Sequence, residues 1–160
     1  MQELSPRLTN TFSTKYSSYG EMLFKIAMVH LGSKEDAEEV MQDAFCKLLY
    51  NSPGFNDDQH EKAWLIKITV NLCKDRLRSV WHKRVIKMEA IEEYYEDPID
   101  SDVMKEILKL PVKLKAVIYL FYVEDYSIKQ ISEILKIKES AIKMRLHRGR
   151  EILRIELKGE

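Results

Sequence analysis

A short helix, a tight break and a longer basic helix are predicted between residues 110 and 153. Ser127 precedes Gln130 by three residues, which is the spacing of a capping box and marks the start of the short helix. The break is predicted at residues 136–138, and the second helix begins at about Glu139. This order constrains the fold more than any other feature, because it is typical of a helix-turn-helix, whose second helix enters the DNA major groove.

The second of these helices has two predicted faces. Its apolar face falls at helical spacing and can pack on a core; it consists of Ile142, Leu146, Gly149 and Leu153. A separate basic stripe consists of Lys143, His147, Arg150 and Arg154. Nucleic acid is therefore the first partner to consider, although the 26 Lys and Arg residues of the whole chain are balanced by 26 Asp and Glu.

The composition indicates a folded, helical chain with room for one ordinary domain or two small ones. Its 160 residues are 45% hydrophobic, which excludes global disorder, and it has only 5 glycines and 4 prolines. The polar N-terminus lacks the apolar stretch of a signal peptide, and no window approaches the roughly 18 apolar residues of a membrane span. We therefore expect a cytoplasmic protein without membrane insertion.

The sequence offers little for catalysis or metal binding. No nucleophile–base pair, phosphate-binding loop or Cys/His cluster stands out, so we expect no enzymatic activity, no metal and no other cofactor. Cys46 and Cys73 lie among apolar residues of predicted helices. We interpret them as buried free thiols in a reducing compartment.

Three helices are predicted in the first half of the chain, at residues 14–31, 34–50 and 61–80. Gly32 ends the first helix as a C-terminal cap, Ser33 caps the second, and a loop rich in Pro, Gly, Asn and Asp follows. These helices can form a small bundle with Trp64 as a central core residue.

The predicted fold is all-α, with two small helical domains joined by an acidic linker. The three-helix bundle occupies residues 1–86, the linker residues 87–102, and the helix-turn-helix domain residues 103–160, beginning with a helix at about 103–109. The linker is assigned from charge: residues 62–87 are basic with Asp75 as their one acid, whereas residues 88–104 hold seven acids and no Lys or Arg.

Three motifs, in order along the chain, resemble those of the extracytoplasmic-function (ECF) sigma factors of the sigma-70 family. DAEEVMQDAF at residues 36–45, and AWLIKITVNL at residues 63–72 with DRLR at 75–78, are similar to segments of sigma region 2. The stretch from residue 110 to residue 150 resembles region 4. One block alone would be weak, because helix-turn-helix patterns are common; three in register are specific.

The resemblance implies a sigma factor that binds core RNA polymerase, directs recognition of the −35 and −10 promoter elements, and has an anti-sigma factor as a partner. The polymerase would do the chemistry. An acidic helix face would bind the clamp helices of the polymerase's largest subunit by pairing with Arg and Lys; it comprises Asp36, Glu39, Gln42 and Asp43. The alternative for this face is a solvated acidic surface.

The resemblance places −10 binding on the third helix and the loop before it. Melting needs a pocket for a flipped base, which the loop residues Phe55, Asn56 and Asp57 are placed to form. It also needs a basic channel for single-stranded DNA; the helix offers Lys67, Asn71, Lys74 and Arg78. The cations would hold phosphates, and Asn71 could read base edges. The alternative is again a solvated face.

Contact with the −35 element is assigned by resemblance to the recognition helix. Arg on guanine edges would supply specificity, Lys on phosphate would supply affinity, and Met144 could pack on a thymine methyl; the residues are Lys143, Met144, Arg145, His147 and Arg148. Lys136 stands where the family usually has glycine, and Ser140-Ala141 replaces the usual Gly-Thr. These departures bear on the −35 sequence preference more than on the role.

Three further interpretations remain open from the sequence. The chain can be a stand-alone helix-turn-helix regulator that does not act through core polymerase, although no dimer interface or effector domain is evident. It can also be a sigma-like adaptor that no longer directs transcription. The acidic linker can mimic nucleic acid in the polymerase channel or serve as a solubilising spacer.

Overall fold

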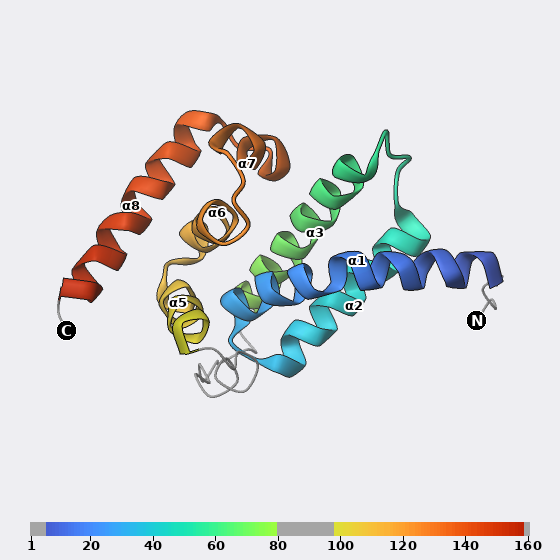
Figure 1. Cartoon of the computed structure of the whole chain (residues 1–160), viewed down its shortest axis with the longest axis horizontal. Helices are drawn as coiled ribbons and strands as arrows, with labels where there is room; N and C mark the ends of the chain where they lie inside the picture. Colours follow the sequence, from blue (N-terminus) through green and yellow to red (C-terminus); the bar gives the residue numbers. More distant parts are fainter. Residues whose placement is uncertain (1–5, 80–97, 159–160) are drawn as a thin grey trace.

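The computed structural model describes residues 6–79 and 98–158, and it confirms the all-α prediction. Within these ranges the chain forms seven helices and no strand (Figure 1). The helices are α1 (Pro6–Leu31), α2 (Lys34–Asn51), α3 (Asp58–Arg78), α5 (Pro98–Lys109), α6 (Val112–Tyr122), α7 (Ile128–Leu135) and α8 (Glu139–Lys158). Most of the predicted acidic linker lies outside the described residues.

The helix-turn-helix begins and ends where its local chemistry predicts. The backbone N–H of Gln130 donates to the Ser127 hydroxyl at 3.1 Å, and the Ser127 N–H donates to the Gln130 side chain at 2.9 Å, so the capping box is formed. Lys136 ends α7 in the left-handed conformation, with a φ of 58°. That conformation favours glycine, so a lysine here is strained.

Three helices begin earlier than the sequence pattern predicts. α1 begins at Pro6 and α3 at Asp58, where Asp57 caps the helix by accepting the His60 N–H at 2.8 Å. α5 begins at Pro98, inside the segment assigned to the linker. Proline suits the first position of a helix, because its ring fixes φ and the missing N–H would have no partner there.

The first three helices pack as a bundle, as predicted, but its centre differs from the prediction. Leu23, Val40, Leu65 and Val70 are fully buried, whereas Trp64 is only half-buried and packs against Phe55 with 5.6 Å between ring centroids. Trp64 therefore lies at the edge of the core beside the α2–α3 loop, because α1 and α2 bury the opposite side of α3.

The C-terminal half is built around α6, which is surrounded by α5, α7 and α8 (Figure 1). Tyr119 on α6 is fully buried. Gly149 lets α8 approach α6 closely, since a Cβ atom there would fall 2.6 Å from Cγ1 of Ile118. The prediction that Gly149 faces the core is confirmed.

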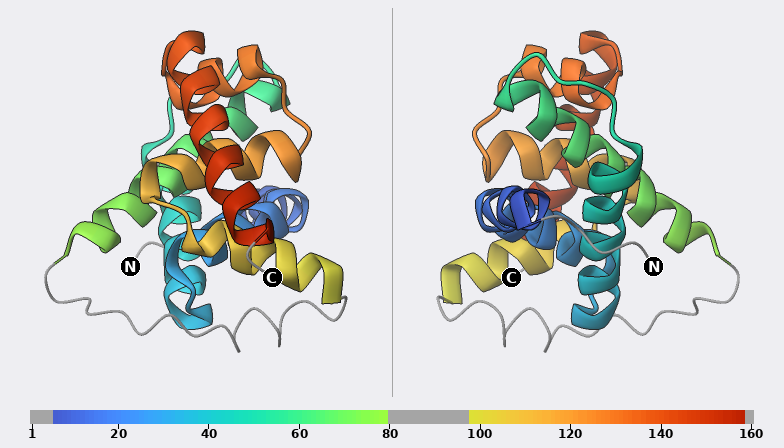
Figure 2. Two further views of the ribbon diagram at one scale, coloured as in Figure 1. Left: turned by 90° about the vertical axis from the view of Figure 1, so that its left-hand side faces the viewer. Right: turned by 90° about the vertical axis from the view of Figure 1, so that its right-hand side faces the viewer.

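The two halves pack directly on each other. α3 lies along α7, and α1 contacts both α5 and α6, so that buried side chains from both halves form one continuous cluster. The two views of Figure 2 show α6, α7 and α8 stacked on the N-terminal bundle. This packing brings the predicted DNA-binding face of α3 against the helix-turn-helix.

Candidate nucleic-acid and partner interfaces

The acidic face of α2 is organised by one arginine of α3. A guanidinium nitrogen of Arg76 lies 2.8 Å from a carboxylate oxygen of Glu39, and other pairs reach Asp43 at 3.5 Å and Asp36 at 3.7 Å. Glu39 and Asp43 keep 61% and 54% of their side-chain surface exposed, whereas Asp36 keeps 24%. Glu39 and Asp43 can therefore bind a partner while they remain paired with Arg76.

Arg76 is a functional candidate that the sequence pattern did not single out. Burial alone would lower the pKa of its guanidinium, but the hydrogen bond and charge of Glu39, with the charges of Asp43 and Asp36, raise the pKa overall. Its position was a usable signal, because a residue two places after Lys74 points away from the predicted basic stripe. Arg76 thus helps to position the carboxylates on this face of α2.

Gln42 lies on the α1 side of the same α2 face. It is exposed and lines a shallow groove of about 350 Å³ with Tyr16, Phe24 and Met41. The predicted partner-binding residues thus divide into carboxylates beside Arg76 and an amide beside this groove.

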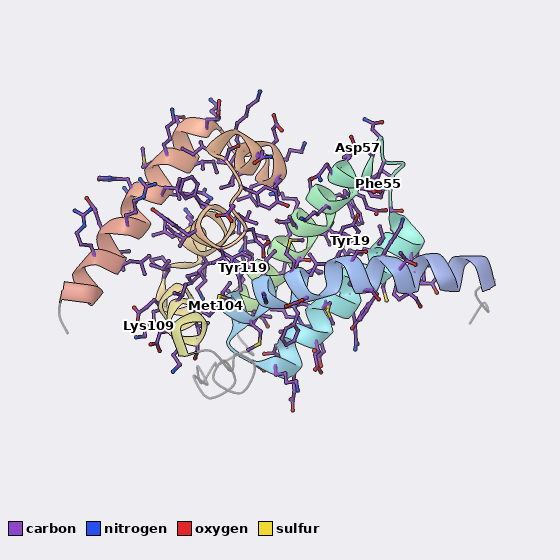
Figure 3. The ribbon with its side chains drawn as sticks, in the orientation of Figure 1. Tyr19, Phe55, Asp57, Met104, Lys109 and Tyr119 are labelled. Carbon is purple, nitrogen blue, oxygen red and sulfur yellow. The ribbon has the colours of Figure 1, made fainter. Side chains whose placement is uncertain are left out.

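The α2–α3 loop holds the three residues predicted to form a base pocket, of which Figure 3 labels two, Phe55 and Asp57. Phe55 is half-buried, with its ring edge-on to those of Trp64 and His60. Asp57 is exposed and caps α3, and the Asn56 N–H donates to Nδ1 of His60 at 3.2 Å while its side chain faces solvent. Each of the three residues therefore also shapes the loop.

The basic stripe of α3 is only partly open to solvent. Asn71 and Arg78 are exposed, whereas Lys67 and Lys74 are half-buried. Lys67 Nζ donates to the backbone oxygen of Leu135 at 2.8 Å, so it contacts the end of α7. Arg78 lies 3.9 Å from the Asp75 carboxylate, on the exposed surface of α3.

Like charges surround the two half-buried lysines. Burial lowers the pKa of Lys67, and the charges of Arg145 and Lys136 lower it further. Burial likewise lowers the pKa of Lys74, with added contributions from Lys67 and Arg145. Cations of α3 therefore repel cations of the helix-turn-helix, whose α7 contacts α3.

The recognition helix α8 presents its predicted contact residues mostly to solvent. Lys143, Met144, His147 and Arg148 are exposed, and Met144 keeps 59% of its surface. Arg145 is half-buried on the side nearest α3. His147 lies 2.9 Å from Glu151, one turn further along α8.

Arg150 has a packing role that differs from the rest of the basic stripe. Its Nε donates to the Tyr122 hydroxyl, and its guanidinium lies 5.6 Å from the ring centroid of Phe121. It joins α8 to α6 through contacts with two aromatic residues. Arg150 therefore stabilises the packing of α8 on α6.

The cysteines fit the prediction in part. Cys73 is buried in the bundle, but Cys46 is exposed on α2, because it lies on the solvent side of that helix. The described residues contain no group of three or more His, Cys, Asp and Glu side chains that could hold a metal ion. In the same ranges, no helix is long and apolar enough to cross a membrane.

Two family models match the chain, in the order in which the two halves occur. The model of Sigma-70 region 2 matches residues 16–83, which include the whole of α2 and α3. The model of Sigma-70 region 4 matches residues 101–153, which include α6, α7 and most of α8. Together the two models cover more than half of the chain.

Curated relatives match over nearly the whole length. The ECF RNA polymerase sigma factor SigW of Bacillus subtilis (strain 168) is 30% identical over 93% of this chain and 90% of its own length. RNA polymerase sigma factor SigV of the same organism is 27% identical over 92% of this chain and 91% of its own length.

Solved structures show the same fold in both halves. CnrH, in a complex with the cytosolic domain of CnrY, superposes with a TM-score of 0.73 at 22% identity, covering 95% of this chain and 90% of that one. RpoE of Bartonella quintana, in a complex with the anti-sigma factor NepR, gives a TM-score of 0.70 at 21% identity, covering 92% and 97%.

Proposed function

Because this chain belongs to the sigma-70 family, and within it to the ECF RNA polymerase sigma factors, we propose that α2 binds core polymerase, α3 the −10 element and α8 the −35 element. A sigma factor binds core RNA polymerase and directs transcription initiation. The main support for the proposal is that each region matched by a family model contains an exposed, charged surface suited to its expected partner. The region 2 match contains the acidic face of α2, and the region 4 match contains the exposed basic start of α8.

The core-binding surface proposed on α2 consists of Glu39, Gln42 and Asp43, with Asp36 at its margin. Two exposed carboxylates and an amide can form charge-assisted hydrogen bonds with Arg and Lys of the clamp helices. Arg76 supports this surface, because its contacts limit the rotamers of the carboxylates before a partner arrives. Such preorganisation reduces the entropy lost on binding.

The −10 surface proposed on α3 combines the loop with the basic stripe. Asn71 and Arg78 are exposed along the helix, and Asn56 is exposed in the loop. Phe55, already held edge-on to Trp64, gives the loop a rigid apolar wall against which an unstacked base can lie. Lys67 would bind a phosphate once its contact with Leu135 is released, and the half-buried Lys74 would bind another on the same face of α3.

The −35 surface proposed on α8 is the exposed start of the recognition helix. Arg145 and Arg148 are suited to guanine edges, Lys143 to a phosphate, and Met144 to a thymine methyl. His147 lies beside this surface, with its Nε2 2.9 Å from a carboxylate oxygen of Glu151. Serine and alanine at residues 140–141 offer one hydroxyl at the start of α8.

We also propose an anti-sigma factor as a partner, and action in the cytoplasm with RNA polymerase. Two structural neighbours support the partner, since CnrH was solved with the cytosolic domain of CnrY and RpoE with the anti-sigma factor NepR. Sigma factors are not enzymes, and in this proposal the polymerase supplies all of the chemistry.

A DNA-binding titration with and without core polymerase tests the proposal against a stand-alone regulator. Native gels would follow a labelled pool of random duplexes mixed with this protein, with bacterial core polymerase, or with both. We expect sequence-specific complexes only when both proteins are present. Sequence-specific binding by the protein alone, unchanged by core polymerase, would contradict the proposal and favour the regulator.

A further inference from the structure

His60, in the first turn of α3, contacts each of the three loop residues proposed to receive a −10 base. Its Nδ1 accepts the backbone N–H of Asn56 at 3.2 Å. Its imidazole ring stands at 90° to the Phe55 ring, with 5.3 Å between the ring centroids. Its own backbone N–H donates to the Asp57 carboxylate at 2.8 Å. Three successive residues of the α2–α3 loop are therefore held by one residue of the helix.

The hydrogen bond from Asn56 also fixes the chemical form of the His60 ring. An N–H donor needs a lone pair on Nδ1, so the neutral imidazole carries its hydrogen on Nε2. The bond uses the backbone N–H of Asn56, and the residue itself is exposed. The contact thus orients the loop backbone without using the side-chain amide, which can read a base edge.

The first turn of α3 is itself anchored from α1. Glu61, next to His60, is only 5% exposed, and Lys15 of α1 donates to its carboxylate at 2.5 Å. Tyr19, which lies below Phe55 in Figure 3, hydrogen-bonds to the same residue. Burial, with the charge and hydrogen bond of Glu61, raises the pKa of Tyr19 to about 12, so its hydroxyl remains a donor. His60 therefore stands on a backbone that α1 holds in place.

Phe55 lies between two rings that are one turn apart on α3. The His60 centroid lies 5.3 Å away and the Trp64 centroid 5.6 Å away, and both pairs are edge-on. Such contacts favour one orientation of the Phe55 ring, which is half-buried and so keeps part of its surface open. A wall that is already oriented spares the entropy of ordering it when an unstacked base arrives.

We propose that His60 is a positioning residue for the −10 surface: it holds the loop backbone and the Phe55 ring in the arrangement that receives an unstacked base. This inference rests on the proposed function, because it names a residue that shapes the −10 surface proposed above. His60 acts through the loop and not by contact with the base. Its side chain can be replaced without removing the helix cap, since the bond to Asp57 uses the backbone N–H.

Three single variants of the full chain test this role. His60→Ala removes both the acceptor for Asn56 and the ring beside Phe55. His60→Asn removes the ring but keeps a side-chain oxygen close to the position of Nδ1, so it restores the acceptor. Gln59→Ala is the matched control, because Gln59 is exposed and precedes His60 in the same turn of α3.

The readout is base preference at each promoter position. Each variant, with core polymerase at a concentration that saturates it, would transcribe a library of promoters with randomised −35 and −10 segments, and the transcribed templates would be sequenced. We expect His60→Ala to reduce the preference for the best base at a −10 position by about tenfold, the equivalent of one hydrogen bond and one ring contact. His60→Asn should lose less, Gln59→Ala should lose nothing, and the −35 preference should stay unchanged in all three.

A second measurement examines the His60 ring in the free protein. Long-range ¹H–¹⁵N NMR spectra in mildly alkaline buffer should show Nδ1 of His60 without a hydrogen and Nε2 with one. The opposite tautomer would overturn the inference, because Nδ1 could not then accept the Asn56 N–H.

Three transcription results would also overturn it. They are an unchanged −10 preference in His60→Ala, an equal loss of preference at −35 and −10 positions, and a loss in His60→Asn as large as that in His60→Ala. Absence of initiation by every form, including the unmodified protein, would instead contradict the proposed function and this inference with it.

Discussion

Arg76 of α3 donates a hydrogen bond of 2.8 Å to Glu39 of α2, and thereby joins α3 to the α2 face proposed for polymerase. The same guanidinium approaches Asp43 and Asp36. The residue therefore serves two purposes. It stabilises the packing of α2 on α3, and it sets the arrangement of carboxylates that a partner would meet.

Replacing Arg76 should reduce stability more than replacing its neighbour on the exposed side of α3. Arg76→Met removes the ion pairs with Glu39, Asp43 and Asp36, which solvent partly screens. We expect it to lower the free energy of unfolding by about 1 kcal/mol. Arg78→Met is the matched control, since the Arg78 side chain is 77% exposed and its ion pair with Asp75 is long, at 3.9 Å. Urea unfolding at neutral pH would measure both; equal losses would contradict the role given to Arg76.

Gly149 should tolerate no side chain. Gly149→Ala places a Cβ against Ile118 and is expected to lower the free energy of unfolding by about 1–3 kcal/mol through overpacking between α6 and α8. Gly54→Ala is the control, because a Cβ at Gly54 would meet nothing within 4 Å. Thermal unfolding of the two variants would check this, and a similar stability of both would show that α8 lies further from α6.

Stability should fall between pH 7 and pH 5 because of His30. This histidine is buried, which lowers its pKa from 6.5 to about 4, although the Ile26 carbonyl acts in the opposite direction. The unfolded chain then binds a proton that the folded chain excludes. The stabilisation is complete above the unfolded pKa of 6.5 and is lost as the pH falls toward 4; the loss from pH 7 to pH 5 is about 2 kcal/mol.

The comparison variant for this pH effect is His30→Met, which keeps an apolar side chain of similar length in the site. Urea midpoints at pH 7 and pH 5 should differ less for the variant than for the unmodified protein. An unchanged difference would assign the pH dependence to other groups.

Arg145→Ala should weaken promoter binding without affecting the polymerase surface. Loss of a guanidinium on a guanine edge costs about 1–3 kcal/mol and relaxes specificity at one position. The reciprocal variant, Gln42→Ala with Asp43→Ala, should weaken core binding and leave contact with the −35 element intact. Fluorescence anisotropy would first measure the binding of each variant to core polymerase, and then the binding of promoter DNA at a core concentration that saturates that variant. Equal loss of both affinities in either variant would refute the division of surfaces.

Local chemistry accounts for what the sequence predicted well. Ser127 and Gln130 start α7 because their side chains satisfy backbone groups three residues away, so the signal is complete within one helical turn. Gly149 could be assigned to the core because it continues a periodic apolar face. Neither inference needs knowledge of the rest of the fold.

Contacts across the chain account for what the sequence did not reveal. Trp64 lies at the edge of the core because α1 and α2 bury the other side of α3. Cys46 is exposed because it lies on the outer side of α2. Lys67 and Lys115 bind backbone oxygens 68 and 85 residues away, respectively, and no periodic pattern encodes such pairs.

In vitro run-off transcription with purified bacterial core polymerase and a library of randomised promoters would show whether this protein acts as a sigma factor. We expect initiation that depends on this protein, on templates that share one −35 motif and one −10 motif at a fixed spacing. Absence of any protein-dependent initiation, while the protein still binds duplex DNA without core polymerase, would contradict the assignment of α2, α3 and α8 to a sigma factor's three surfaces.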